Sequence, residues 1–119
     1  MVLGGGTVMK VKIREIGNVR VVDLEGELKL GAGDTALRET VRGLVSQGHS
    51  RIVLNLRGVK WIDSSGVGEL VACRKRTVER GGDTKLLMPS EGVYNLLVLV
   101  RLHEYFNIFH EEPLALLSF

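Results

Sequence analysis

Two adjacent hydroxyl side chains near the middle of the chain are the groups best placed to do chemistry. Ser64 and Ser65 follow Asp63 and precede Gly66, at a point where an apolar run gives way to helical spacing. The first turn of a helix offers backbone N–H groups and a partial positive charge, and both stabilise a phosphate. A phosphate at this point would therefore be stabilised locally, although helix capping alone also accounts for these residue types.

Catalysis by either serine finds little support elsewhere in the sequence. A serine nucleophile needs a base held by a third group. The candidate bases, His49, His103 and His110, have no recognisable spacing to Ser64. The segment also differs from the Gly-x-Ser-x-Gly elbow of hydrolases. We therefore expect a protein that is not an enzyme.

Cofactor binding is equally poorly supported. Gly66-Val67-Gly68 at a helix start would let a phosphate approach, but the full nucleotide-binding pattern is missing, so only weak nucleotide binding stays open. Cys73 is the only cysteine, and the dispersed histidines do not complete a metal-ligand set with it. We expect no metal and no cofactor, and we expect Cys73 to pack as a small residue beside a helix core face.

The strands that must position the serines follow from apolar periodicity. Alternation and the turn pair Gly17-Asn18 predict a hairpin of residues 8–16 and 19–24. The continuous apolar run 52–56 predicts a central strand covered on both faces, with 57–62 as a connection returning to the sheet edge. Residues 85–88 and 105–109 complete the expected strands.

Three helices are expected between these strands. The first is capped by Asp34 or Thr35 and ends near Gln47-Gly48, the second runs from Asp63 to Gly81-Gly82, and the third starts at Pro89-Ser90. Residues 113–119 form a closing helix turn or pack irregularly. The residues expected on the buried helix faces are Leu37, Val41, Leu44 and Val45, then Val67, Leu70, Val71 and Val78, then Val93, Leu96, Leu97 and Val100.

The element order predicts the fold class. The order β-β-α-β-α-β-α-β implies an α/β domain with one mixed sheet, an opening hairpin and helices packed on it. We expect a flexible N-terminal tail at residues 1–7 and a single domain over residues 8–119.

Composition limits the partners. The formal net charge of +2 and the scarcity of aromatic residues argue against direct nucleic-acid binding. The cluster Arg74, Lys75, Arg76 and Arg80 is expected to be a solvated helix face. The longest apolar stretch, 93–102, is too short for membrane insertion. One cysteine and no secretory signal predict a cytoplasmic protein.

Several segments together resemble the STAS family of bacterial anti-sigma factor antagonists. The similar segments are Leu24–Leu28, Val53–Leu56, Trp61–Gly68 and Gly81-Gly82, and the resemblance runs from about Val8 to Phe109. It implies a STAS domain that binds a serine-kinase anti-sigma factor and thereby frees a sigma factor. It further implies that the kinase phosphorylates Ser64 and ends binding, that a serine phosphatase reverses the mark, and that the protein is a monomer or weak homodimer.

The resemblance also implies a partner surface. Its expected residues are Glu27, Leu28, Lys29, Asp63, Ser64, Ser65, Gly66 and Val67. Lys29 is a departure, because the family often has an acidic residue there, and this reversal bears on which partner is bound. For Trp61 and Ile62 both core packing and an exposed contact beside Ser64 stay open. STAS domains also act as scaffolds of stress-sensing complexes and as accessory subunits of lipid transporters, and those roles stay open too.

Overall fold

The opening hairpin forms where the alternating sequence pattern predicts it. The computed structural model describes residues 9–119, so the expected tail at 1–7 lies outside the described residues. Strands β1 (Lys10–Ile16) and β2 (Val19–Leu28) pair antiparallel around Gly17-Asn18. Strand β2 continues four residues beyond its predicted end at Leu24, because its second half pairs with β3.

Strand β3 (Arg51–Ile62) is longer than the predicted run 52–56. The expectation that residues 57–62 form a connection is wrong, because Trp61 and Ile62 pair with Glu27 and Leu28 of β2. The register between the two strands shifts after Asp23 and again after Gly26. Each shift breaks the period of two, which conceals the strand from a pattern search.

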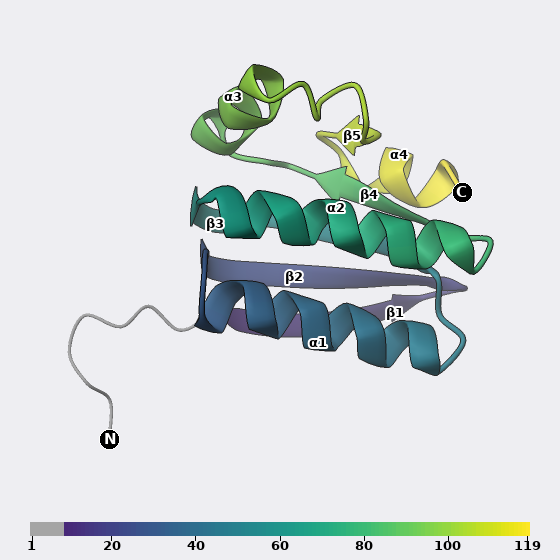
Figure 1. The fold of residues 1–119 in the computed structure, drawn as a ribbon. Helices are drawn as coiled ribbons and strands as arrows, with labels where there is room; N and C mark the ends of the chain where they lie inside the picture. The colour runs from purple at the N-terminus through teal and green to yellow at the C-terminus, as the bar shows by residue number, and fades with distance from the viewer. Residues whose placement is uncertain (1–8) are drawn as a thin grey trace.

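The strands form one mixed sheet in the order β1-β2-β3-β4-β5, in which only the β1–β2 pair is antiparallel (Figure 1). Strand β4 spans Asp83–Leu87 rather than 85–88. Strand β5 is limited to Ile108–Phe109, and Phe106 of the predicted strand 105–109 packs in the core instead. The predicted α/β class with a mixed sheet is confirmed.

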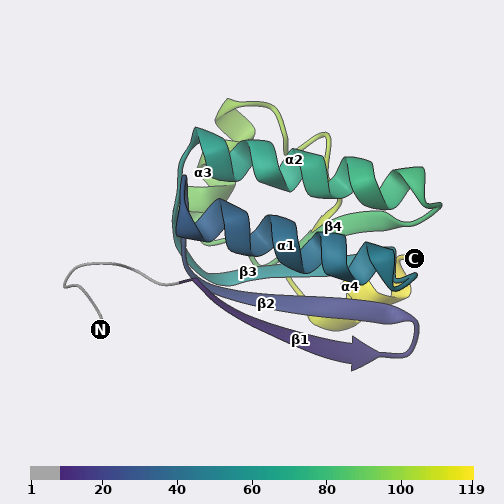
Figure 2. The same ribbon diagram turned by 60° about the horizontal axis from the view of Figure 1, so that its bottom comes forward.

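Helices lie on both faces of this sheet. The described residues form α1 (Ala32–Ser46), α2 (Ser64–Glu79), α3 (Glu91–Leu99) and α4 (Glu112–Leu117). Figure 2 shows α1 and α2 side by side over one face and α4 behind the sheet. Helix α1 starts earlier than predicted, because its N-cap is Gly31 and not Asp34 or Thr35. Asp34 lies three residues further along, and its Oδ1 accepts a hydrogen bond from Gly31 N–H at 3.0 Å.

The core has two parts because β3 and β4 are covered on both faces. Val22, Leu54 and Leu86 point to the larger cluster under α1, α2 and α3, whereas Val21, Val53 and Leu87 point to the smaller cluster under α4. This confirms the doubly covered strand predicted from residues 52–56. Cys73 is fully buried, as expected.

Two residues predicted on buried helix faces are exposed instead. Val78 is 49% exposed in the last turn of α2, and Val100 is 45% exposed at the C-cap of α3. Both lie at helix ends, where a helical face can extend past the elements that cover it.

A forked ion pair joins α4 to the sheet. The Arg14 guanidinium donates from Nε to Asp23 Oδ2 at 2.7 Å and from Nη2 to Glu112 Oε1 at 2.6 Å. The hydrogen bonds from Arg14 and from the Asn55 amide hold the pKa of Asp23 below its usual value. Arg14 therefore fixes both the hairpin and the helix that closes the smaller core.

Replacing this arginine tests the attachment of α4. We expect Arg14→Met to lower the free energy of unfolding by about 1–2 kcal/mol and to speed hydrogen exchange in α4 but not in α1. The difference from wild type is full above about pH 5 and narrows as pH falls below the ordinary carboxyl pKa of 3.8, because the unfolded chain then binds a proton at Asp23 while the lowered pKa keeps the folded wild type ionised. Lys10→Met on the same strand is the matched control. Unchanged exchange in α4 would refute this role.

Candidate functional site

Ser64 is the first residue of α2 and its side chain is exposed. The N-cap is Asp63, whose Oδ1 accepts from Gly66 N–H at 2.9 Å. The Ser64 hydroxyl has no hydrogen-bond partner within residues 9–119. Because capping is done by the neighbouring aspartate, this hydroxyl is exposed and unbonded at the positive end of the helix.

Asp63 also connects α2 to the loop between β2 and α1. Its Oδ2 accepts from Leu30 N–H at 3.1 Å, and its own N–H donates to the carbonyl of Leu28 at 3.3 Å. Hydrogen bonds from Gly66 and Leu30 N–H hold the pKa of Asp63 below its usual value. One ionised carboxylate therefore fixes the loop and the helix start relative to each other.

The close approach of these segments requires glycine at position 66. A Cβ on Gly66 would overlap the carbonyl oxygen of Leu28, and a Cβ on Gly33 would overlap that of Glu27. The short path from β3 into α2 is therefore packed directly on the end of β2. This packing brings the two predicted partner segments, 27–29 and 63–67, together at the carboxyl ends of the parallel strands.

The predicted partner residues differ in accessibility. Lys29 is exposed and forms an ion pair with the partly buried Glu27 at 3.5 Å. The Leu28 side chain is fully buried in the larger core, so in this structure it supports the loop from inside. Gly66 is buried, whereas Ser65 and Val67 are partly exposed.

The two residues before Asp63 point in opposite directions. Ile62 is buried in the larger core, whereas Trp61 is 57% exposed. The structure thus supports core packing for Ile62 and an exposed apolar position for Trp61. Leu30, on the other side of Asp63, is 73% exposed.

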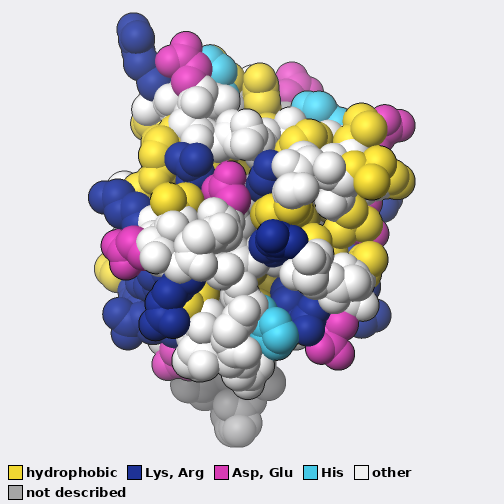
Figure 3. Space-filling model, turned by 90° about the vertical axis from the view of Figure 1, so that its right-hand side faces the viewer, with side chains coloured by type: hydrophobic (Ala, Val, Ile, Leu, Met, Phe, Trp, Pro, Cys, Tyr) yellow, Lys and Arg dark blue, Asp and Glu magenta, His cyan; other side chains and the backbone are white. Residues whose placement is uncertain are grey.

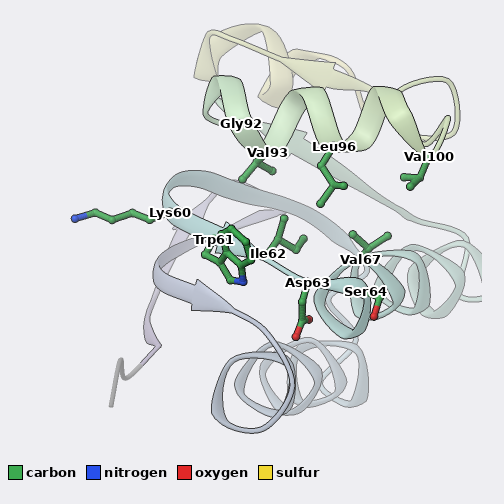
Figure 4. Close-up of a pocket in the computed structure, with 10 residues that line it drawn as sticks. All are labelled: Lys60, Trp61, Ile62, Asp63, Ser64, Val67, Gly92, Val93, Leu96 and Val100. Atoms are coloured by element: carbon green, nitrogen blue, oxygen red, sulfur yellow. The ribbon is translucent and has the colours of Figure 1, made fainter. Parts of the chain in front are cut away.

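An apolar groove beside Ser64 was missed by sequence reasoning. It has a volume of about 660 Å³, and in Figure 4 it lies between α3 and the junction of β3 with α2. The α3 side is formed by Val93, Leu96 and Val100, and the opposite side by Trp61 and Val67. The available signal was the unbroken run Leu96–Val100, which has more apolar residues than one buried helix face needs.

The predicted basic cluster is partly neutralised. Arg74 pairs with Asp83 at 2.9 Å and Arg76 with the buried Glu69 at 2.8 Å, so neither forms part of a free solvated face as expected. Figure 3 shows acidic and basic side chains interspersed on the end of the molecule opposite the start of α2.

Other chemistry has no support in the described part of the chain. No group of three or more potential ligands among histidine, cysteine, aspartate and glutamate lies close enough to hold a metal ion within residues 9–119. Burial raises the pKa of the Cys73 thiol, which keeps it protonated. Over the same residues, no helix combines the length and the apolar character needed to cross a bilayer.

The bridging role of Asp63 is testable. Asp63→Ala should lower the Tm and speed hydrogen exchange at Leu30, whereas Asp63→Asn should restore part of the Tm, because asparagine is also a good N-cap. Since the folded-state pKa is lowered, the difference between wild type and Asp63→Ala should be full above the ordinary value of 3.8 and decline as pH falls from there through the lowered folded-state pKa. Equal exchange at Leu30 in all three proteins would contradict the bridge.

The two glycines of α2 provide a matched pair. Gly66→Ala should destabilise the protein by about 1–3 kcal/mol, because its methyl group must displace the β2 carbonyl. Gly68→Ala meets nothing within 4 Å and should stabilise by about 0.5–1 kcal/mol. Urea titrations measure both. Equal effects of the two substitutions would show that the close approach does not constrain the helix start.

Known proteins are similar to this one over nearly the whole chain. The family model "STAS domain" matches residues 10–115. An "Anti-sigma F factor antagonist" of Paenibacillus polymyxa is 25% identical over 108 residues, covering 91% of this chain and 92% of the relative.

Solved structures show the same fold. An anti-sigma factor antagonist from Mycobacterium paratuberculosis superposes with a TM-score of 0.82 at 19% identity, covering 92% of each chain. The Bacillus cell fate determinant SpoIIAA in its phosphorylated form superposes with a TM-score of 0.71 at 23% identity, covering 90% of this chain and 96% of that one. The element order, the sheet and the family match lead to one conclusion: this chain belongs to the STAS domain family.

Proposed function

We propose that this protein is an anti-sigma factor antagonist that is switched off by phosphorylation of Ser64. In its active state it binds a serine-kinase anti-sigma factor and releases a sigma factor. The observation that carries the proposal is the exposed hydroxyl of Ser64 at the first position of α2, with no partner of its own among residues 9–119. A relative named as an anti-sigma F factor antagonist and a similar fold solved in a phosphorylated form support it.

The proposed covalent step is a simple transfer. The Ser64 hydroxyl oxygen attacks the γ-phosphorus of ATP held by the kinase, its proton passes to a base of the kinase, and ADP leaves. Ser64 gains roughly −1.5 to −2 charges. The backbone N–H groups and the dipole of α2 stabilise that charge, so the domain itself stays folded.

The same phosphate on Ser64 would weaken binding to the kinase. The proposed contact surface comprises Glu27, Lys29 and residues 63–67, with Leu28 supporting it from the core. A phosphate within this surface is costly to desolvate against an apolar partner. It would also add negative charge beside the ionised Asp63. A change of about 2.8 kcal/mol already corresponds to a hundredfold loss of affinity.

The proposal also includes reversal of the phosphorylation, the location of the protein and its oligomeric state. A serine phosphatase removes the phosphate and restores binding. The protein acts in the cytoplasm as a monomer or weak homodimer, and it has no catalytic activity of its own. The ion pair of Lys29 with Glu27 neutralises part of the loop that faces the kinase, so partner choice depends on this pair.

Phosphorylation and binding test the proposal together. Incubation with a purified serine-kinase anti-sigma factor of the same organism and ATP should add one phosphoryl group, mapped to Ser64 by mass spectrometry. Ser64→Ala should stay unmodified and bound in the presence of ATP. Ser64→Asp should bind about a hundredfold more weakly than wild type (~2.8 kcal/mol).

Ser65→Ala is the matched control, because it changes the neighbouring hydroxyl only, and it should still be phosphorylated. Modification that maps to another residue would overturn the site. Equal affinity of wild type and Ser64→Asp for the kinase would overturn the switch. Association only with transporter subunits or with a large homo-assembly would favour the scaffold or accessory role instead.

A further inference from the structure

A second pocket lies at the amino ends of the parallel strands, the opposite end of the sheet from Ser64. Figure 2 shows the β1–β2 turn and the end of α1 together there, whereas α2 starts at the other end. The pocket has a volume of about 470 Å³, within the range of about 300–1,000 Å³ typical of small-molecule sites. Its lining comes from the hairpin, at Gly17, Asn18 and Arg20, and from residues 48–51, which lead into β3. The proposed switch uses none of these residues.

The lining of this pocket is positively charged. It contains the guanidinium groups of Arg20 and Arg51 and the imidazole of His49, but no aspartate or glutamate. Glu15 lies close by and pairs with Arg20 at 3.2 Å, while its own side chain stays 72% exposed. The charge of Arg51 is therefore the one that needs a counter-ion.

The Arg51 side chain has no partner in the part of the chain that the structure describes. Its neighbour across the sheet is Asp83 on β4, but that carboxylate pairs with Arg74 at 2.9 Å and also accepts from Thr84 N–H at 2.8 Å. A planar guanidinium with free N–H groups matches the oxygens of a phosphate or a carboxylate. Arg51 is thus free to hold an anion in the pocket.

Neutral donors complete the lining. The Asn18 amide and the Ser50 hydroxyl have no hydrogen-bond partner among the described residues. Arg20 Nη1 is fixed by two backbone carbonyls of the hairpin at 3.1 and 3.3 Å, and its Nη2 lies 3.5 Å from His49 Nε2. In the neutral imidazole Nε2 then accepts from Arg20, which leaves Nδ1–H as a donor. Every uncommitted side chain of the pocket therefore offers an N–H or an O–H.

Capping of α1 does not account for these basic side chains. A helix C-terminus attracts cations through its dipole. The last carbonyls of α1, however, accept from the backbone N–H groups of residues 47–49 at distances between 2.9 and 3.2 Å. Within residues 9–119, neither Arg20, His49 nor Arg51 donates a side-chain hydrogen bond to them. The donors of the pocket remain for a bound molecule.

We propose that this pocket binds a phosphate monoester, with Arg51, the Ser50 hydroxyl and the His49 imidazole on the phosphoryl oxygens and Arg20 holding the imidazole in place. A phosphate monoester offers three terminal oxygens and up to two charges, enough for all three donors at once. A carboxylate offers two oxygens and one charge, which Arg51 alone would occupy. The inference goes beyond the proposed function, because this site is separate from Ser64 and needs no kinase.

Titration with glycerol 3-phosphate tests the site on the whole chain. In ¹H–¹⁵N spectra the amide resonances of residues 48–51 should shift saturably, whereas those of residues 63–67 should not. Glycerol at the same concentrations should shift neither set. If residues 48–51 do not respond to glycerol 3-phosphate, or if glycerol alone shifts them equally, the phosphate site is overturned.

A lipid headgroup carries the same phosphate chemistry, and sedimentation with vesicles separates the two sources. Co-sedimentation with phosphatidylcholine vesicles that contain phosphatidic acid, but not with phosphatidylcholine alone, would assign the phosphate to a membrane lipid. Binding of glycerol 3-phosphate without co-sedimentation would assign it to a small soluble ester. Either result must be lost when Arg51 is replaced, since binding that survives this change lies elsewhere and contradicts the proposal.

Matched variants test the assignment. Arg51→Gln should weaken binding of glycerol 3-phosphate about tenfold or more. Arg57→Gln, an exposed arginine of the same strand outside the pocket, should not. Ser64→Ala should bind like wild type, so loss of the switch would leave this site intact. Circular dichroism melts establish folding, and His49→Gln replaces Arg51→Gln if that variant does not fold. Equal affinity of wild type and a folded pocket variant would overturn the site.

Discussion

The arrangement of the site depends on the carboxylate of Asp63. One oxygen caps α2 through Gly66 N–H and the other holds Leu30 N–H of the neighbouring loop, at 2.9 and 3.1 Å. Because this side chain satisfies the cap, the adjacent Ser64 hydroxyl faces solvent instead of the helix backbone. Asp63 thus does the capping, and the hydroxyl next to it is left for the proposed phosphorylation.

The fold supports this division through backbone packing. Gly66 and Gly33 let the starts of α2 and α1 approach the end of β2, and the register shifts in β2 and β3 carry both strands out to Leu28 and Ile62. The loop and the helix start therefore share one rigid edge of the sheet. In the proposed switch, a charge added at Ser64 would act on this preformed surface without a change of fold.

Much of this organisation could be predicted from local pattern. The hairpin, the helix starting after Asp63 and the mixed sheet follow from periodicity and turn residues. The second half of β3 could not be predicted, because the register shifts between Asp23 and Glu25 and between Gly26 and Glu27 interrupt alternation. The opposite exposures of Trp61 and Ile62 depend on which side of the strand faces the core, and the groove depends on where α3 packs. Both are tertiary properties that adjacent residues do not encode.

The central claim is that phosphate on Ser64 is tolerated by the domain and rejected by its partner. The most direct test prepares the Ser64-phosphorylated protein and measures its Tm and its Kd for the kinase beside those of unmodified protein. The account predicts an unchanged or higher Tm together with a large loss of affinity. A phosphorylated protein that unfolds, or one that binds the kinase as tightly as before, would contradict it.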